Sequence, residues 1–138
     1  SALVQGLYKE VKSVDKNKIF GVSPAGGFVG DIPDSDVKNL STDLLKWCKN
    51  PGYIDYVMPQ IYWDYNHATA PFSEVFNKWD NFVSSEDVAL YPGLAPYKIP
   101  QLMSEESIYK QIADINASKK AKGFALFRYE NILSMKFN

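Results

Sequence analysis

The sequence is poor in the residues that build metal and disulfide sites. Its 138 residues include one cysteine, Cys48, and one histidine, His67. A single cysteine excludes an internal disulfide framework and a cysteine-rich zinc site, and a single histidine argues against a multi-histidine metal centre or a Ser-His triad. We therefore expect no bound metal. Cys48, close to Leu44 and Trp47, is predicted to be an inert thiol on the buried face of a helix.

Long apolar runs, basic blocks and phosphate-binding glycine motifs are missing as well. No apolar run approaches the ~18 residues of a membrane-spanning helix, so we expect no membrane span. The 15 Lys and Arg residues balance 16 Asp and Glu residues, and without a basic patch we expect no nucleic-acid partner. Neither GxGxxG nor GxxxxGK[ST] occurs, which argues against a nucleotide cofactor.

What the chain has in excess is aromatic residues: nine Tyr, eight Phe and three Trp, or 14% of the sequence. Hydrophobic residues make up 46% and charged residues 22%, which is typical of a globular chain. Length predicts one domain, residues 1–138. Aromatic rings fill protein cores, but they also stack on flat apolar ligands such as sugar rings.

Short apolar runs rich in β-formers alternate with longer helical stretches. Four strands are expected: Ile19–Ser23, Tyr53–Trp63, Val88–Ala95 and Gly123–Tyr129. They begin about 35 residues apart, a spacing that predicts right-handed βαβ units, parallel strands and an α/β fold. Four such units form either a small open sheet or half of a (β/α)8 barrel. The near-continuous apolar run of the second strand predicts burial on both of its faces.

Five helices are expected between and around these strands: Leu3–Val14, Leu44–Cys48, Phe72–Val83, Ile108–Lys119 and a short closing helix at Ile132–Phe137. In the first helix one face carries four apolar residues, which we expect to point inward: Leu3, Leu7, Val11 and Val14. The segment 41–43 offers an N-cap for the second helix, and Ser104 opens the fourth.

Active sites of parallel α/β folds lie beyond the carboxyl ends of the strands. Rings and hydrogen-bonding groups gather there: Ser23, Gln60, Tyr62, Trp63, Asp64, Tyr97, Lys98, Arg128 and Glu130. A sugar site needs this combination, because rings stack on the apolar face of a pyranose while amides and hydroxyls bind its rim. The sequence therefore predicts a carbohydrate ligand.

Glycoside hydrolysis usually needs two carboxyl groups. Asp64 and Glu130 are the acids immediately beyond strand ends, and they are the candidate catalytic pair. Each has a simpler interpretation, since Asp64 is also suited to capping the following loop and Glu130 to a solvated turn. Three further acids in a turn-rich loop, Asp31, Asp34 and Asp36, are better suited to caps and turns. His67 is either a ligand contact or simply exposed.

One segment makes the pattern specific. Residues 52–63 read GYIDYVMPQIYW, which resembles a signature of glycoside-hydrolase-like family ten, a bacterial family long listed as a domain of unknown function. Three other segments resemble family strands in the same order: FGVSP at 20–24, LYPGLAPYKI at 90–99 and GFALFRY at 123–129. Two departures are an AGGF segment at 25–28 and Arg128, which stands where the family usually has Ser.

The resemblance implies a TIM-barrel enzyme of the bacterial cell envelope, or a secreted one, with peptidoglycan-type glycans as substrate. It implies that these residues form strands five to eight, the C-terminal half of the barrel. The family's acidic stretch after strand four, of the type DGIHFDDY, has no counterpart in the sequence. The resemblance carries over six residues as substrate-side groups: Ser23, Gln60, Tyr62, Trp63, Tyr97 and Lys98. Arg128 joins them by its place at the same edge.

Three functions remain open from the sequence. The chain supplies part of a glycoside hydrolase, or it is a non-catalytic carbohydrate-binding or wall-associated module, or it is a half-barrel that associates with itself. Four βα units leave two unpaired strand edges and half a core, which a folded protein has to cover. The expected partner is therefore an upstream half of the barrel or a second copy of the chain.

Overall fold

A computed structural model describes residues 1–28, 43–83, 86–133 and 135. Its strands are short and all parallel: β1 (Gly21–Val22), β2 (Tyr56–Val57), β3 (Ala89–Leu90), β4 (Gly93–Leu94) and β5 (Ala125–Leu126). β2 lies between β1 and β3, and β4 pairs with β5. The bridges Ala25–Gln60, Gln60–Gly93 and Leu90–Ala121 join these pieces into four neighbouring extended segments in chain order. The predicted α/β class with parallel strands is confirmed.

Helices alternate with the strands, as the apolar periodicity predicts. Over the described residues the α-helices are α1 (Ala2–Val14), α3 (Leu44–Lys49), α4 (Phe72–Phe82), α5 (Glu105–Ala117) and α6 (Tyr129–Ile132), and the 3-10 turns are η1 (Gly26–Phe28) and η2 (Pro96–Lys98). Side chains cap two helices: Asp43 accepts from the Lys46 N–H at 3.3 Å, and Ser104 accepts from the Ser107 N–H at 3.1 Å.

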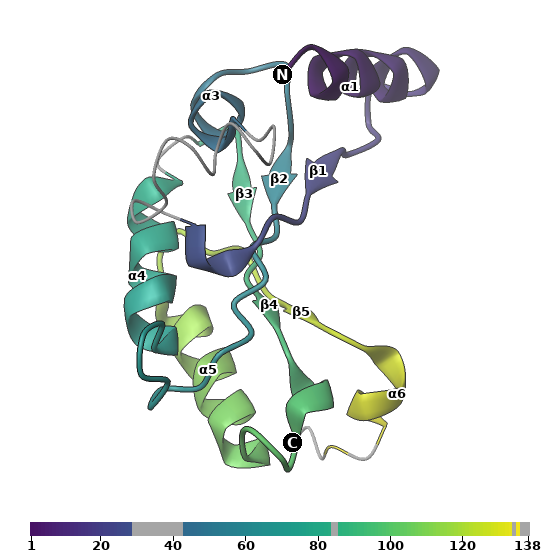
Figure 1. The fold of residues 1–138 in the computed structure, drawn as a ribbon. Coiled ribbons are helices and arrows are strands. Elements are labelled where there is room, and N and C mark those ends of the chain that lie inside the picture. Colours follow the sequence, from purple (N-terminus) through teal and green to yellow (C-terminus); the bar gives the residue numbers. More distant parts are fainter. Residues whose placement is uncertain (29–42, 84–85, 134, 136–138) are drawn as a thin grey trace.

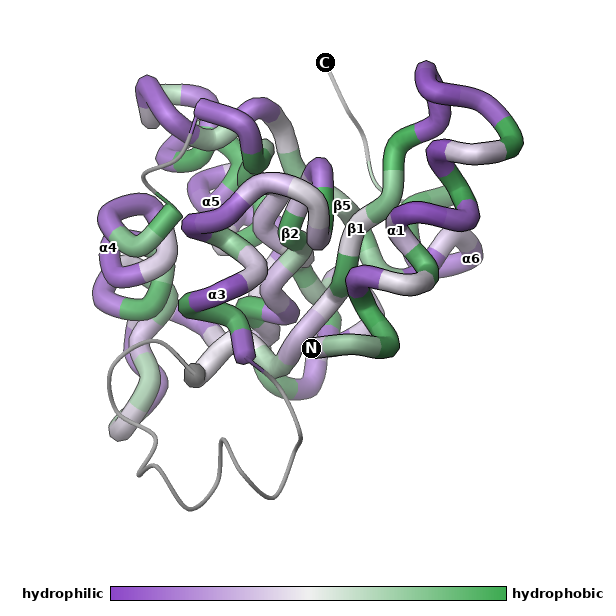
Figure 2. The backbone as a smooth tube through the Cα atoms, turned by 90° about the horizontal axis from the view of Figure 1, so that it is seen from above, coloured by the Kyte–Doolittle hydropathy of each residue, from purple (hydrophilic) through white to green (hydrophobic). Residues whose placement is uncertain are grey.

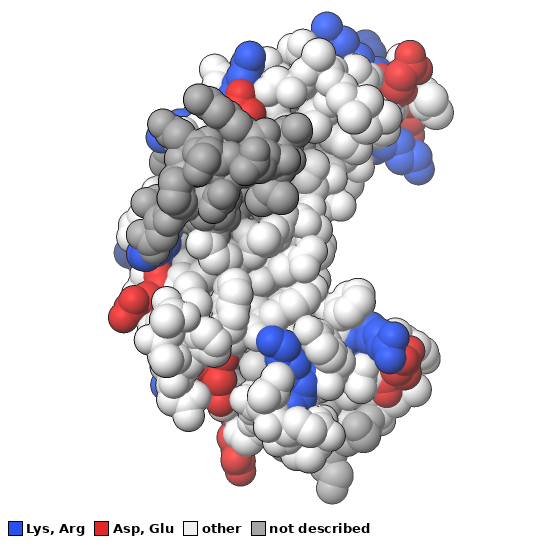
Figure 3. All heavy atoms as spheres, in the orientation of Figure 1, with Lys and Arg blue, Asp and Glu red and all other residues white. Residues whose placement is uncertain are grey.

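The molecule is a crescent in which α3, α4 and α5 line the convex side (Figure 1). From above, these three helices lie on one side of the strands, and α1 and α6 lie on the other (Figure 2). The face of the strands turned away from α4 and α5 opens into a hollow between α1 and α6 (Figures 1 and 3). We call it the hollow face.

The core fills the space between the strands and the convex helices. Its most buried residues come from both layers: Val57, Ile61, Leu90 and Leu94 from the strand segments, and Phe72, Trp79, Ile108 and Ile115 from α4 and α5. Trp79 also donates from its indole Nε1 to the Gly26 carbonyl at 2.6 Å. This bond ties η1 to α4 and brings the chain after β1 close to the convex helix.

The expectation that the second strand is buried on both faces is wrong. Along this strand Val57, Pro59 and Ile61 are buried against the convex helices, whereas Tyr56, Met58, Gln60 and Tyr62 are only half-buried. The second set points to the opposite face, because successive side chains of a strand alternate. Since that face opens into the hollow, the apolar run has one dry side and one accessible side.

The first helix is confirmed, but its predicted inward face is wrong. Leu3 is 74% exposed and Val14 is 83% exposed, while Val4 packs against the core. The helix is fixed instead through Asp55, at the start of the second extended segment. The Asp55 carboxylate pairs with Lys12 at 2.9 Å, and it accepts from the Phe20 N–H at 2.7 Å. An ion pair at the sheet's amino end therefore sets which side of α1 faces the protein.

The closing helix also differs from its prediction, because α6 covers Tyr129–Ile132 rather than Ile132–Phe137. Residues 134 and 136–138 lie outside the described part of the chain. The same holds for the predicted cap residues 41 and 42 and for Asp31, Asp34 and Asp36.

Candidate functional site

A hydroxyl and an amide meet at the ends of the first two strand segments. Ser23 donates from Oγ to the Met58 carbonyl at 2.8 Å. Gln60 donates from Nε2 to the Ser23 carbonyl at 3.1 Å and to Ser23 Oγ at 3.3 Å. The parallel register, with a bridge between Ala25 and Gln60, brings the two residues together. Both residues also line one of the clefts described below.

Three aromatic rings stand beside this pair. The Tyr62 and Phe127 rings are stacked, with centroids 6.1 Å apart and an interplanar angle of 18°. Tyr97 meets Tyr62 edge-on at 5.9 Å and Phe127 edge-on at 5.8 Å. Phe127 remains 52% exposed, which leaves an apolar ring surface open to a ligand. We call these three residues the aromatic cluster.

Tyr62 is held in place by its neighbours. Lys98 donates from Nζ to the Tyr62 carbonyl at 2.6 Å. Burial raises the pKa of the Tyr62 hydroxyl, and the neighbouring Tyr97 raises it further. The hydroxyl therefore stays protonated at neutral pH and keeps its donor.

Two clefts have Tyr62 as a common lining residue. The inner cleft, about 340 Å³, is lined by Ser23, Met58, Gln60, Tyr62, Gly93, Ala125, Leu126 and Phe127. The outer cleft, about 190 Å³, is lined by Tyr62, Trp63, Asp64, Asn66, His67, Lys98, Leu102 and Met103. The surface of the hollow in Figure 3 is largely uncharged, and Lys, Arg, Asp and Glu gather on the two arms and the outer rim.

Trp63, in the outer cleft, is supported from behind by α5. Gln111 is fully buried and donates from Nε2 to the Trp63 carbonyl at 2.9 Å. The Trp63 ring lies 6.0 Å from the exposed His67 ring. His67 itself accepts from the Ala70 N–H at 3.1 Å, so its ring helps to shape the loop that carries the cleft.

The two candidate acids lie in different surroundings. Asp64 lines the outer cleft, and its Oδ1 accepts from the Tyr65 N–H at 2.7 Å. Its main-chain carbonyl accepts from the His67 and Phe72 N–H groups at 3.3 Å and 3.1 Å, so Asp64 also organises the loop. Glu130 lies in the first turn of α6 and pairs with Arg128 at 2.8 Å, with both side chains exposed.

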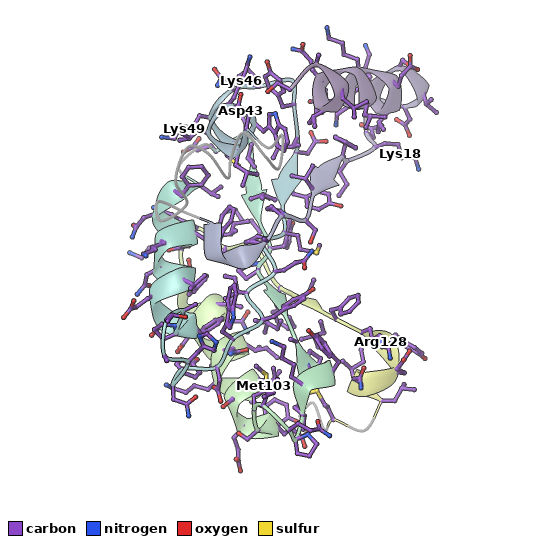
Figure 4. All side chains as sticks on the ribbon, viewed as in Figure 1. Lys18, Asp43, Lys46, Lys49, Met103 and Arg128 are labelled. Carbon is purple, nitrogen blue, oxygen red and sulfur yellow. The ribbon has the colours of Figure 1, made fainter. Side chains whose placement is uncertain are left out.

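Arg128 lies with α6 on the lower arm of the crescent in Figure 4, and Met103 lies in the same half of the molecule. The labelled lysines of α3, Lys46 and Lys49, lie at the opposite end. The predicted edge residues thus divide into those that line the two clefts, Tyr97 in the aromatic cluster beside them, and the exposed Arg128–Glu130 pair at the start of α6.

Comparison with known families decides the affiliation. The model of the family described as "Glycosyl hydrolase-like 10" matches residues 1–111. The chain belongs to this family. The match includes the predicted residues from Ser23 to Lys98 and ends before Phe127, Arg128 and Glu130.

Curated relatives agree with this family. The chain is 29% identical over 145 residues to "Glycosyl hydrolase YngK" of Bacillus subtilis (strain 168), an alignment that covers 94% of this chain and 28% of the relative. It is 30% identical over 106 residues to "Glycosyl hydrolase DigH" of Escherichia coli (strain K12), which covers 70% of this chain and 24% of the relative. The chain thus spans about a quarter of the length of these relatives.

In this member of the glycosyl hydrolase-like 10 family, the sequence did not predict Phe127 and Gln111 as residues of the site. Phe127 lies inside the fourth predicted strand, but its exposure follows from pairing, because its N–H bonds the Leu94 carbonyl at 2.9 Å. The alternation of that strand was the available signal, since Ala125 and Phe127 share one face. Gln111 sits among the inward isoleucines of α5, and a polar residue at such a position is itself a signal of a buried partner.

Within the ranges 1–28, 43–83 and 86–133, no group of three or more His, Cys, Asp or Glu side chains is placed to hold a metal ion. Over the same part of the chain, none of the helices has the length and apolar character needed to cross a bilayer.

Proposed function

We propose that this chain forms the glycan-binding side of a glycosyl hydrolase that acts on bacterial cell-wall, peptidoglycan-type glycans. The observation that carries the proposal is the aromatic cluster of Tyr62, Tyr97 and Phe127 beside the Ser23–Gln60 pair. Stacked and edge-on rings offer apolar faces for a pyranose, and the amide and hydroxyl match its polar rim. The family affiliation supports a glycan as ligand.

The charge distribution favours a neutral sugar surface over a highly charged polymer. The inner cleft is lined by uncharged residues only, and the hollow as a whole is largely uncharged in Figure 3. A polyanion would need several cations at the contact. A glycan with hydroxyl and acetamido groups needs hydrogen-bonding partners and apolar faces, and both are present.

The same proposal places the four strand segments at positions five to eight of a (β/α)8 barrel in a secreted or cell-envelope protein. Support comes from the parallel order, the three helices α3, α4 and α5 along the convex side, and clefts at the carboxyl ends of the strands. The hollow face is then covered by an upstream half of the barrel or by a second copy of the chain. Light scattering separates the two: a mass of 15.6 kDa favours the upstream half, and twice that mass favours a second copy.

Asp64 is the proposed catalytic acid, because it lines the outer cleft beside Tyr62 and Trp63. Glu130 is the proposed second carboxyl group, held by its pair with Arg128. Arg128, like Ser23, Trp63, Tyr97 and Lys98, is proposed as a substrate contact. General acid work requires a carboxyl group within hydrogen-bond reach of the glycosidic oxygen.

Binding is tested by titrating the chain with the tetramer of β-1,4-linked N-acetylglucosamine in a calorimeter. Phe127→Ala should weaken binding by about 0.5–1.5 kcal/mol, the usual contribution of one aromatic contact beyond its buried area. The matched control is Leu45→Ala, which removes a 59% exposed apolar residue from α3 on the convex side and should leave affinity unchanged. Equal affinity of the Phe127→Ala variant and the unchanged chain would remove the aromatic cluster from the site.

Cleavage is a separate readout on the same samples. Release of new reducing ends that Asp64→Asn abolishes, with binding retained, would support the catalytic role of Asp64. Binding without any release supports the second candidate function, a non-catalytic carbohydrate-binding or wall-associated module. The exposed Phe127 ring favours binding in either case.

A further inference from the structure

The inner and outer clefts are lined by different residues except for one. Tyr62 belongs to both. Its ring is stacked on Phe127, a residue of the inner cleft, and its backbone carbonyl accepts a hydrogen bond from Lys98, a residue of the outer cleft. One residue therefore lines two openings at the carboxyl ends of the strands.

From this arrangement we infer that the two clefts are neighbouring subsites of a single glycan site, which takes an oligosaccharide of at least two sugar units, one on each side of Tyr62. The inference rests on the proposed function and adds the length and direction of the ligand. A monosaccharide fills one cleft only.

The inner subsite recognises its sugar unit through neutral groups. The Phe127 ring supplies the apolar surface, and the Gln60 amide and Ser23 hydroxyl supply hydrogen bonds. Gly93 adds no side chain, which keeps the cleft wide; a Cβ built there would lie 3.5 Å from the Tyr62 ring. The subsite is thus suited to an uncharged sugar unit.

The outer subsite has a different chemistry. Trp63 and Leu102 provide apolar surface, whereas Asp64, His67 and Lys98 provide ionisable groups. The two ends of a bound glycan therefore meet different partners, neutral inside and ionisable outside. This difference gives the ligand a fixed direction across Tyr62.

The three methionines of the chain supply a direct test. Met58 lines the inner cleft, Met103 lines the outer cleft, and Met135 is a buried residue outside both sets of lining residues. Methyl-13C-methionine labelling gives one NMR signal for each, assigned by single Met→Leu variants. The Met135 signal reports on the fold during a titration.

The probes are N-acetylglucosamine and its β-1,4-linked dimer, trimer and tetramer. The monosaccharide should move at most one of the two cleft signals, those of Met58 and Met103. The longer probes should move both along a single saturation curve, with roughly tenfold tighter binding than the monosaccharide. Trp63→Ala, which removes the largest apolar surface of the outer cleft, should abolish this gain in affinity for the longer probes.

Leu102→Ala is a second outer-cleft variant with little risk to the fold, because Leu102 is 69% exposed. It should also reduce the gain, whereas Leu45→Ala should not. A Met103 signal that stays still while Met58 moves, or two signals that saturate with different dissociation constants, overturns the inference and leaves the proposed function standing. No movement of either signal with any probe defeats both.

Discussion

Gly26→Ala should disrupt the site from its backbone outward. Gly26 begins η1, directly after the bridge between Ala25 and Gln60. A Cβ at position 26 would lie 2.2 Å from the Gln60 carbonyl oxygen, 2.6 Å from its carbonyl carbon and 2.9 Å from the Ile61 nitrogen. All three atoms are backbone, so no side chain can rotate away to relieve the clash.

The magnitude follows from the bonds that the movement breaks. Ordinary contact begins near 3.4 Å, so the two segments must separate by about 1 Å. This separation breaks the hydrogen bond from the Gln60 N–H to the Pro24 carbonyl, which is 3.0 Å long in the unchanged protein. It also strains the hydrogen bond from the Trp79 indole to the Gly26 carbonyl. At about 1–3 kcal/mol for each buried group left unpaired, we expect a loss of about 2–4 kcal/mol in the free energy of unfolding.

Urea unfolding followed by circular dichroism measures this loss, and the m value should stay constant. The control is Gly6→Ala in α1, where a Cβ meets nothing within 4 Å and Ala should stabilise the helix by about 0.5–1 kcal/mol. Gly26→Ala should also weaken glycan binding, because Gln60 and Ser23 move apart. A Gly26→Ala chain within about 0.5 kcal/mol of the unchanged protein would refute the steric argument.

Three further changes have defined outcomes. Gln111→Leu removes the donor to the Trp63 carbonyl, but it also removes a buried Oε1 that has no partner. The free energy of unfolding should therefore change by less than about 1 kcal/mol, and a shifted Trp63 resonance should report the released loop. A decrease of more than about 2 kcal/mol in the free energy of unfolding contradicts this reasoning. Burial raises the pKa of Cys48 from 9.0 to about 12; because the native state holds this proton more tightly, stability should fall from pH 9 upward, and less steeply in Cys48→Ala. Asp55→Asn removes the ion pair with Lys12 but keeps an oxygen that can accept a hydrogen bond. It should lower the free energy of unfolding, measured by urea unfolding, by no more than about 1 kcal/mol.

Local signals predicted the elements that pack on the convex side. The apolar stripe of α4 and the Ser104 cap of α5 were readable in the sequence, and both helices lie within three residues of their predicted bounds. The face of α1 was not readable, because it depends on Asp55, a partner more than forty residues away. Regular strands are also shorter than the apolar runs suggest, since pairing covers only part of each run.

The candidate site was likewise predictable only where local sequence rules apply. The rule that groups gather beyond strand ends located Ser23, Gln60 and Tyr62, which the register brings together. Phe127 escaped, because its exposure on the hollow face depends on pairing with β4 rather than on the residue type. Helix rotation, which turns Gln111 toward the Trp63 carbonyl, is likewise set by tertiary packing.

The attachment of α1 through Asp55 has a consequence for how the molecule opens. The helix has no fully buried residue, so little apolar contact is lost when it detaches. Segments held this way unfold locally at a lower free energy than the core. In native-state hydrogen exchange the amides of α1 should therefore exchange well before those of α4, whose inner face carries the fully buried Phe72 and Trp79.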